Sequence, residues 1–397
     1  MIPRTPLPPA PRAIALTLLA LALPGCAVNH RPAATIASLS AEAAPIRIAE
    51  RATVDTIIER LAQRAVKRGD RTLDILLLSG GGQMGAYGAG FLRGWRTRTE
   101  TPLPRFDLVT GISTGALQSV FALVGTESAL DTLSALYKRA GDRIAPTVDW
   151  FSWLRRTGGV VNTKRYRNSI AQLLDEGMQG DLRAAFAEGR QLAVSSADYD
   201  LGIGRTWDLA REIDTTRAGR ERVGRILLAA TAIPGIFPPV VIDDHVHGDG
   251  GVIANLLPVL DLAGYRRLAS RLKAVGMKEP VTVRLWAILN IFTHPPIAVM
   301  NPASRKAIGA RGTTLLFWSH QPQQLRALEE LSRAVSADVP GLRLEMHFTA
   351  IPQELSLDPA ASKLFQTSFM LQLERLGYDR ARSVKPWDTV VSPFERP

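Results

Sequence analysis

A serine between two glycines is the first feature of the sequence that could do chemistry. Residues 111–115 read Gly-Ile-Ser-Thr-Gly, directly after the strand pattern Phe106 to Thr110 and at the start of a helical pattern from Thr114 to Val124. A strand, a sharp turn and a helix in this order expose a serine hydroxyl at the turn, and small glycines on either side permit the strained backbone and admit a substrate. Ser113 is therefore a candidate nucleophile.

A loop of consecutive glycines follows an earlier strand pattern, Leu73 to Leu78. Residues 79–85 read Ser-Gly-Gly-Gly-Gln-Met-Gly, and a helical pattern begins at Gly85. Backbone N–H groups in such a loop lie bare of side chains, beside the positive end of a helix, so they can hold an oxyanion or a phosphate. The dinucleotide fingerprint G-x-G-x-x-G is also present, but the acidic residue about 20 positions on, Glu100, precedes the second strand pattern instead of ending it. The candidate oxyanion donors are Gly80, Gly81, Gly82 and Gln83.

A carboxylate followed by paired glycines, Asp249-Gly250-Gly251, is the third feature. Alone, this triplet is a turn signal. It follows Thr-Ala-Ile-Pro at 231–234 and Phe-Pro-Pro at 237–239, and it precedes Asn-Leu-Leu-Pro at 255–258. Taken in this order, the glycine loop, the serine turn and the Asp-Gly-Gly triplet resemble the patatin-like phospholipase family over residues 73–258.

The resemblance implies a fold and a mechanism. The fold is a three-layer α/β/α arrangement with a mainly parallel central sheet. The chemistry is hydrolysis of lipid acyl esters, of the phospholipase A or lysophospholipase type, by a Ser-Asp dyad without histidine, metal or cofactor. Ser113 attacks the ester carbonyl, Asp249 takes the proton, and N–H groups of the glycine loop hold the oxyanion. The family usually has a cation where this chain has Met84, which weakens the expectation of a phosphate contact.

Two rival sites and two rival functions remain open. His294, His320 or His347 could complete a Ser-Asp-His triad, because the chain order would suit an α/β-hydrolase. His245, His247 and Asp249 would share one face of a strand and could bind a metal. The alternative functions are an acyltransferase on the same dyad and a non-catalytic envelope lipoprotein that binds lipid.

Repeated strand, turn and helix patterns predict a parallel sheet covered by helices, with ligands at the carboxyl ends of the strands. Further strand patterns lie at 191–195, 281–289 and 342–348. Before the first strand, an apolar stripe from Val54 to Val66 predicts an amphipathic helix within residues 46–70. The catalytic domain is expected to span residues 71–397.

The first residues resemble a bacterial lipoprotein signal. Arg4 and Arg12 precede the apolar run Ala13 to Leu23, which is too short to span a membrane. The box Leu-Pro-Gly-Cys ends at Cys26, the single cysteine of the chain. We expect residues 1–25 to be a signal peptide, Cys26 to be lipidated, and residues 26–45 to be a tether. The expected location is the bacterial envelope, with an anchor in the outer membrane facing the periplasm; an ordinary signal peptide is the alternative.

The amino-acid composition limits the class of protein and the kinds of site that are possible. With 46% apolar and 21% charged residues, the chain is neither disordered, collagenous nor a multi-pass membrane protein. A single cysteine excludes an intramolecular disulfide and a cysteine-built zinc site. The formal charge of +11 is dispersed along the chain, so we expect no nucleic-acid partner. A lipid or phospholipid substrate is what the family resemblance implies. Aromatic and basic residues at 150–156 suit either a membrane interface or a packed insertion.

Overall fold

The computed structural model describes residues 31–139, 147–148, 157–214, 216–362 and 365–388. The predicted signal peptide, Cys26 and the cluster at 150–156 lie outside the described residues. The helices are α1 (Ile36–Arg68), α2 (Gly85–Arg96), α3 (Thr114–Val124), α4 (Glu127–Lys138), α7 (Lys164–Leu173), α8 (Glu176–Ala187), α9 (Leu209–Glu212), α10 (Arg217–Ala230), α11 (Leu262–Ala274), α12 (Arg305–Asp338) and α13 (Thr367–Arg382). The strands are β1 (Thr72–Leu78), β2 (Leu108–Ile112), β3 (Thr147–Val148), β4 (Val161–Asn162), β5 (Gln191–Asp198), β6 (Ile203–Asp208), β7 (Val240–Ile242), β8 (His245–Asp249), β9 (Val281–Leu289) and β10 (Leu342–Ala350).

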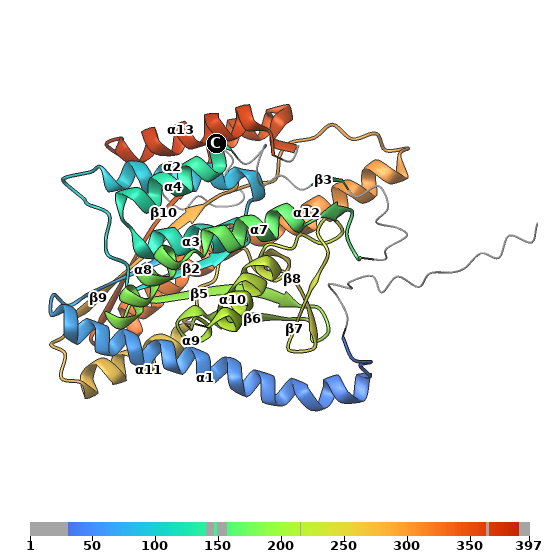
Figure 1. The fold of residues 1–397 in the computed structure, drawn as a ribbon. Helices are drawn as coiled ribbons and strands as arrows, with labels where there is room; N and C mark the ends of the chain where they lie inside the picture. Colours follow the sequence, from blue (N-terminus) through green and yellow to red (C-terminus); the bar gives the residue numbers. More distant parts are fainter. Residues whose placement is uncertain (1–30, 140–146, 149–156, 215, 363–364, 389–397) are drawn as a thin grey trace, which may run out of the picture.

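An eight-stranded sheet forms the centre of the molecule, in the order β10-β9-β1-β2-β5-β8-β7, with β6 also paired to β5 (Figure 1). The five strands from β10 to β5 are parallel to one another, whereas β6 and β8 run antiparallel to β5. This arrangement confirms the predicted mainly parallel sheet.

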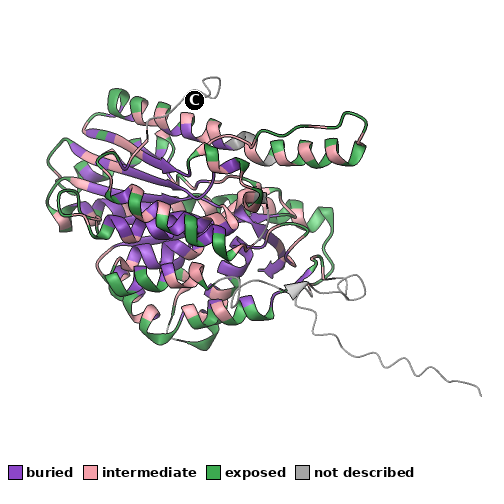
Figure 2. Cartoon of the chain, turned by 90° about the horizontal axis from the view of Figure 1, so that it is seen from above, coloured by how far each residue is buried: buried purple, intermediate pink, exposed green. Residues whose placement is uncertain are grey.

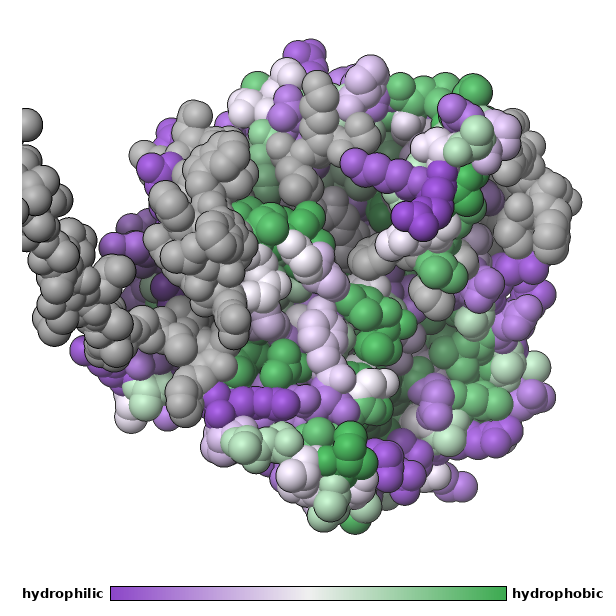
Figure 3. All heavy atoms as spheres, turned by 90° about the vertical axis from the view of Figure 1, so that its right-hand side faces the viewer, coloured by the Kyte–Doolittle hydropathy of each residue, from purple (hydrophilic) through white to green (hydrophobic). Residues whose placement is uncertain are grey.

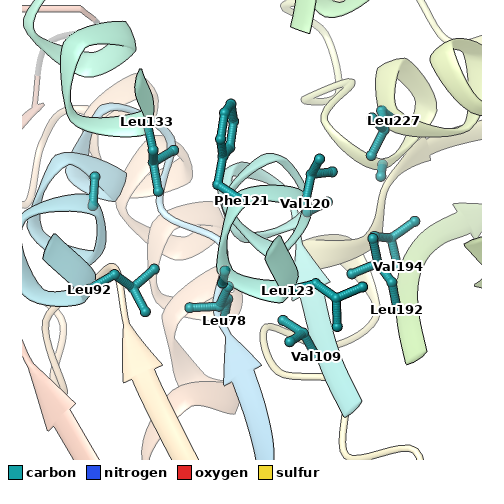
Figure 4. Packing of buried hydrophobic residues seen from close by; sticks show 14 of the residues in the cluster. Leu78, Leu92, Val109, Val120, Phe121, Leu123, Leu133, Leu192, Val194 and Leu227 are labelled. Atoms are coloured by element: carbon teal, nitrogen blue, oxygen red, sulfur yellow. The ribbon is translucent and has the colours of Figure 1, made fainter. Parts of the chain in front are cut away.

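Both faces of the sheet are covered by helices, which confirms the predicted three layers. Along β1, Leu76 and Leu78 enter one apolar core with α2, α3, α4, α7, α8, α10 and α13, while Ile75 and Leu77 enter the other with α1, α11 and α12. A strand buried on both faces reads as a continuous apolar run, as β1 does. Figure 4 shows α3 packed over the sheet, with Val120 and Leu123 close to apolar side chains of the strands.

Helix α1 begins at Ile36, ten residues before the helix that the sequence predicted, and so it takes up much of the predicted tether. Thr35 caps its first turn in a capping box with Ser38, and Pro45 lies inside the helix. The first turns of α1 contact residues far along the chain, since the Glu42 carboxylate lies 2.8 Å from His245 Nε2. Sequence periodicity missed the extension because the fully buried residues of the helix begin only at Ile57.

The other end of α1 is joined to the sheet by a buried carboxylate. Asp107, just before β2, accepts hydrogen bonds from Arg64 Nε at 2.8 Å and from Arg68 at 2.5 Å. It also accepts the N–H of Asp74 in β1 at 2.8 Å. The Asp107 side chain is fully buried, so its charge depends on these partners. None of the helices in the described part of the chain has the length and apolarity that crossing a membrane requires.

We expect Asp107→Ala to lower the free energy of unfolding by about 3 kcal/mol, because it removes one partner from a buried ion pair. Asp70→Ala is the matched control, since Asp70 pairs with the same Arg68 but its side chain is 52% exposed. The control should cost under about 1 kcal/mol. Urea unfolding followed by circular dichroism measures the free energy of unfolding of both variants. Equal losses would contradict the stabilising role of the buried Asp107 ion pairs.

Candidate active site

Ser113 lies at the turn between β2 and α3, with φ 51° and ψ −124°. This positive φ is rare for a residue other than glycine and marks a strained turn. The flanking glycines make the turn possible. A Cβ on Gly111 would lie 2.3 Å from the carbonyl oxygen of Gly115, and a Cβ on Gly115 would lie 2.3 Å from that of Leu78. The sheet and α3 therefore pack this closely only without side chains at both positions.

The pairing of β5 brings Asp249 to this turn. Ile112, the last residue of β2, is paired with Ser195 of β5, and Asp249 of β8 is paired with the next residue, Ser196. Because β6 covers β5 from Ala193 to Asp198 on the other edge, β2 and β8 must follow one another along a single edge. The serine that follows β2 and the aspartate that ends β8 are thus neighbours.

Ser113 and Asp249 are in direct contact. The Ser113 Oγ donates a hydrogen bond to Asp249 Oδ2 at 2.6 Å, and the N–H of Gly251 donates to Asp249 Oδ1 at 2.8 Å. Both side chains belong to buried residues, 7% and 3% exposed. Burial raises the pKa of Asp249 to about 6, and the hydrogen bonds from Ser113 and Gly251 hold it from rising further. An aspartate of this pKa is a much better proton acceptor than a free one.

The glycine loop lies against the nucleophile. A Cβ on Gly80 would lie 3.1 Å from the Cβ of Ser113, and a Cβ on Gly81 would overlap the carbonyl oxygen of Asn290 at 1.7 Å. Gly81 and Gly82 have φ values of 158° and 56°. Among the described residues, nothing accepts the N–H groups of these two glycines. The N–H of Gly80, in contrast, donates to the carbonyl oxygen of Asn255 at 3.3 Å, so this predicted oxyanion donor is already engaged.

Buried amides that the sequence analysis missed support this loop. Asn290, directly after β9, donates two hydrogen bonds to Ser79 of the loop. Its N–H donates to Ser79 Oγ at 2.8 Å, and its Nδ2 donates to the Ser79 carbonyl oxygen at 2.9 Å. The same Nδ2 contacts Gln118 Oε1 at 2.9 Å, and Gln118 Nε2 donates to the carbonyl oxygen of Gly85. A polar residue at the carboxyl end of the predicted strand 281–289 was the signal that could have revealed Asn290.

Gln83 and Met84, the two residues after the three glycines, have different surroundings. Gln83 Nε2 donates to the carbonyl oxygen of Ala360 at 2.9 Å, and Gln83 Oε1 accepts the N–H of Gln366 at 2.7 Å, which ties the loop to the segment before α13. Met84 is half-buried and packs against both apolar cores. The position where the family usually has a cation is therefore part of the packing between the layers.

An apolar pocket opens from Ser113. Its polar end is formed by Gly82, Gln83, Ser113 and Thr114. The remaining described lining is mostly aliphatic and aromatic, with no charged side chain: Leu117, Leu133, Leu136, Tyr137, Tyr166, Ser169, Ile170, Leu173, Thr231, Ile233, Phe237, Phe365 and Met370. Its few hydroxyls are paired, since the Tyr166 OH donates to Thr231 Oγ1 at 2.7 Å and the Tyr137 OH contacts Thr114 Oγ1. Such a pocket fits a hydrocarbon chain.

Residues 76–263 match the patatin-like phospholipase family. This part of the chain, which is less than half of it, resembles a patatin-like phospholipase domain. The match confirms the resemblance on which the sequence analysis relied, and it includes the glycine loop, Ser113 and Asp249. Solved structures also match, among them the crystal structure of VipD from Legionella pneumophila. That match has 12% identity and a TM-score of 0.32, and it covers 78% of this chain but only 66% of the VipD chain. A comparison with curated proteins found no match.

Four histidines of the chain have described side chains, and each contacts groups other than the Ser113–Asp249 pair. His245 lies 3.1 Å from Asp198, and His247 Nδ1 lies 3.0 Å from Ser196 Oγ. His294 is hydrogen-bonded to the adjacent Thr293, and His347 stacks on Trp286 with ring centroids 4.2 Å apart. This stacking half-buries His347 on β10.

β8 does not bring together the metal site that the sequence offered as an alternative. His245, His247 and Asp249 instead have the separate partners given above. Within the described residues, one other group of possible ligands lies together: Asp198, Asp200 and His245. Arginines already neutralise it, since Arg31 lies 2.5 Å from Asp200 and Arg205 lies 3.6 Å from Asp198. This group is an ion-pair network that fastens the chain before α1 to the turn after β5.

The raised pKa of Asp249 makes the domain less stable at neutral pH. The folded protein binds the Asp249 proton more tightly than the unfolded chain, so stability falls as the pH rises from about 4 to about 6, by up to ~3 kcal/mol above that window. Asp249→Asn keeps the shape without the charge. We expect it to raise the melting temperature at pH 8 and to have a smaller effect at pH 4.5. Thermal unfolding across this range tests the sign, and a pH-independent difference would contradict it.

Proposed function

We propose that this protein hydrolyses carboxylic esters of lipids by a Ser-Asp dyad through an acyl-enzyme. The observation that carries the proposal is the 2.6 Å hydrogen bond from Ser113 to a buried Asp249, at the head of a pocket with an apolar lining. The match of residues 76–263 to a phospholipase family supports a lipid substrate. The polar end of the site supplies the reaction chemistry, and the pocket supplies a place for the acyl chain.

The first half-reaction forms the acyl-enzyme. Ser113 Oγ attacks the ester carbonyl carbon while its proton passes to Asp249 Oδ2. The negative charge on the carbonyl oxygen is stabilised by the N–H groups of Gly81 and Gly82, with Gln83 the remaining donor of the predicted set. When the intermediate collapses, the bond between the carbonyl carbon and the alcohol oxygen breaks. Asp249 returns its proton to the departing alkoxide, so the alcohol leaves neutral.

The second half-reaction releases the acid. A water molecule attacks the acyl carbonyl carbon and gives its proton to Asp249, and the same N–H groups stabilise the second oxyanion. Collapse breaks the bond to Ser113 Oγ, which takes the proton back from Asp249. Because the described lining of the pocket has no charged side chain, recognition depends on the acyl chain and the ester, and a phosphate has no cation to bind there. This favours the broader activity, lipid acyl-ester hydrolysis, over a strict phospholipase.

We also propose that the mature protein is a lipoprotein of the bacterial envelope, anchored through Cys26 to the outer membrane on its periplasmic side. The support is the basic and apolar pattern of residues 1–25 and the lipoprotein-like box that ends at Cys26. Ala27 follows the cysteine instead of an acidic residue, which by resemblance to proteobacterial lipoproteins permits sorting to the outer membrane.

We expect Ser113→Ala and Asp249→Asn each to reduce ester hydrolysis by about 10⁴ while the fold is kept, because each removes one half of the proton transfer. Single alanine substitutions of the six histidines should keep most of the activity: His30, His245, His247, His294, His320 and His347. Hydrolysis of a medium-chain ester and circular dichroism of each variant measure the two quantities.

The histidine series decides between the dyad and a triad, since an aspartate is needed in both. A folded histidine variant as inactive as Ser113→Ala would refute the dyad. A fluorophosphonate probe tests the non-catalytic alternative, because a lipid-binding module would not be labelled at Ser113. Product analysis with an added alcohol separates hydrolysis from acyl transfer.

We expect Cys26→Ser to leave the protein unprocessed or to release it into the soluble periplasmic fraction, because the acyl anchor supplies most of the membrane affinity. Fractionation of cells that express each form, with metabolic labelling by a palmitate analogue, measures both effects. Unchanged processing and membrane association of the Cys26→Ser protein would contradict the lipoprotein assignment.

A further inference from the structure

A loop and a helix end stand off from the body of the molecule. Residues 291–304 leave β9 and lead into the first turns of α12, and the Arg311 guanidinium donates to the carbonyl oxygen of Pro296 at 2.7 Å, so the loop runs back along the helix. We call residues 295–316 the projecting hairpin. Figure 2 shows it beside the body, in the colours of exposed and intermediate residues along most of its length.

The projecting hairpin begins beyond the middle of α12, where hydrogen bonds to Asn255 hold the helix to the body of the molecule. Gln321 and Gln324 accept hydrogen bonds from Asn255, the residue whose carbonyl oxygen binds Gly80 of the glycine loop. The helix axis beyond this point, from Gln321 back to Arg305, is about 24 Å long at 1.5 Å per residue. The hairpin therefore extends past the carboxyl edge of the sheet, where the Ser113 pocket lies.

Apolar side chains of the hairpin face solvent. Val299 is fully exposed at 102%, Ile297 is 68% exposed and Ile308 is 47% exposed. Leu315 and Leu316 are 40% and 72% exposed. Isolated exposed aliphatic residues are normal on a protein surface, but a cluster on one projecting element marks an interaction site. Figure 3 views this side of the molecule and shows apolar groups spread across it between hydrophilic ones.

The charge of this segment has one sign. Residues 280–328 contain no aspartate or glutamate, and the hairpin has three cations, Arg305, Lys306 and Arg311. Arg305 and Lys306 are exposed, at the first positions of α12, close to Val299 in the sequence. Exposed aliphatic residues beside exposed cations form the pattern of an element that lies in the interface of an anionic membrane.

The start of α1 lies at the same edge of the sheet. Glu42 contacts His245, and β8 runs from His245 to Asp249 beside Ser113. Asp200 holds Arg31 at this edge, so the five residues from Cys26 to Arg31 can extend at most about 18 Å. A lipid on Cys26 would lie on the same side as the hairpin, but docking by the hairpin does not depend on that anchor.

We infer that the projecting hairpin docks the protein on an anionic lipid surface, with Val299 and Ile297 inserted among the lipids and Arg305 and Lys306 against their headgroups. The opening of the Ser113 pocket then faces the bilayer from which a lipid ester enters. A lipid surface fits better than a protein partner, because the apolar residues lie on a narrow projection whose own charged residues are all cations.

The test measures binding without hydrolysis. The full chain with Cys26→Ser is mixed with vesicles of ether-linked phosphatidylcholine, with and without 30% ether-linked phosphatidylglycerol, and vesicle flotation gives the bound fraction. Val299→Asp should weaken binding to the anionic vesicles at least tenfold. Val384→Asp is the matched control, because Val384 is 95% exposed and follows α13 at the opposite edge of the sheet; it should change binding less than twofold. Arg305→Gln and Lys306→Gln should each weaken it about fivefold and reduce its dependence on salt.

A second readout does not depend on a charged substitution. Val299→Cys and Val384→Cys, each in the Cys26→Ser background, are labelled with a polarity-sensitive fluorophore. Addition of anionic vesicles should shift the emission of the label at 299 to the blue and leave the label at 384 unchanged. Equal binding by the parent and Val299→Asp, together with no shift at 299, would overturn the inference. A change from dimer to monomer on Val299→Asp, with unchanged vesicle binding, would assign the hairpin to a second copy of this chain instead.

Discussion

One edge of β5 determines the chemistry of this protein. Strand β2 pairs with the first part of that edge and ends at Ser113, and β8 pairs with the rest and ends at Asp249. The register leaves the two side chains 2.6 Å apart without any intervening group. A one-residue slip of either strand would turn the side chain to the other face of the sheet, so the site depends on the register that the cores on both faces enforce.

Burial of this contact has opposing effects. Loss of water raises the pKa of Asp249 to about 6 and makes it a competent base, but the same loss destabilises the charged form. Hydrogen bonds from the surrounding structure compensate for the lost hydration of this site. The Gly251 N–H satisfies one carboxylate oxygen, and the glycine loop is held by Asn290 and Gln118 in a fixed conformation. The pocket beyond is apolar, so the reacting groups lie where charges interact strongly and water is scarce.

The carboxyl ends of the parallel strands lie at one side of the sheet, and the other features that concern lipid lie at that side. The pocket opens there, α12 projects past it, and α1 begins beside it (Figure 1). At the opposite edge, Asp107 and its arginines hold α1 against the sheet. The ion pairs of Asp107 thus lie at the amino ends of the strands, and the candidate catalytic groups lie at the carboxyl ends, as expected for a parallel α/β sheet.

Local patterns in the sequence determined much of this. The apolar run of β1, the strand patterns of β9 and β10, the glycines at 80–82 and the serine turn at 113 each follow from short-range chemistry. The order of the three motifs led to the family that residues 76–263 match. Sequence indicated Asp249 as the partner of Ser113 only through the family resemblance. The contact itself depends on strand register, which joins residues 136 positions apart. Tertiary structure also decided that Gly80 binds Asn255, that Asn290 and Gln118 support the loop, and that α1 begins at Ile36. These facts depend on contacts between distant segments, which periodicity and local propensity do not encode.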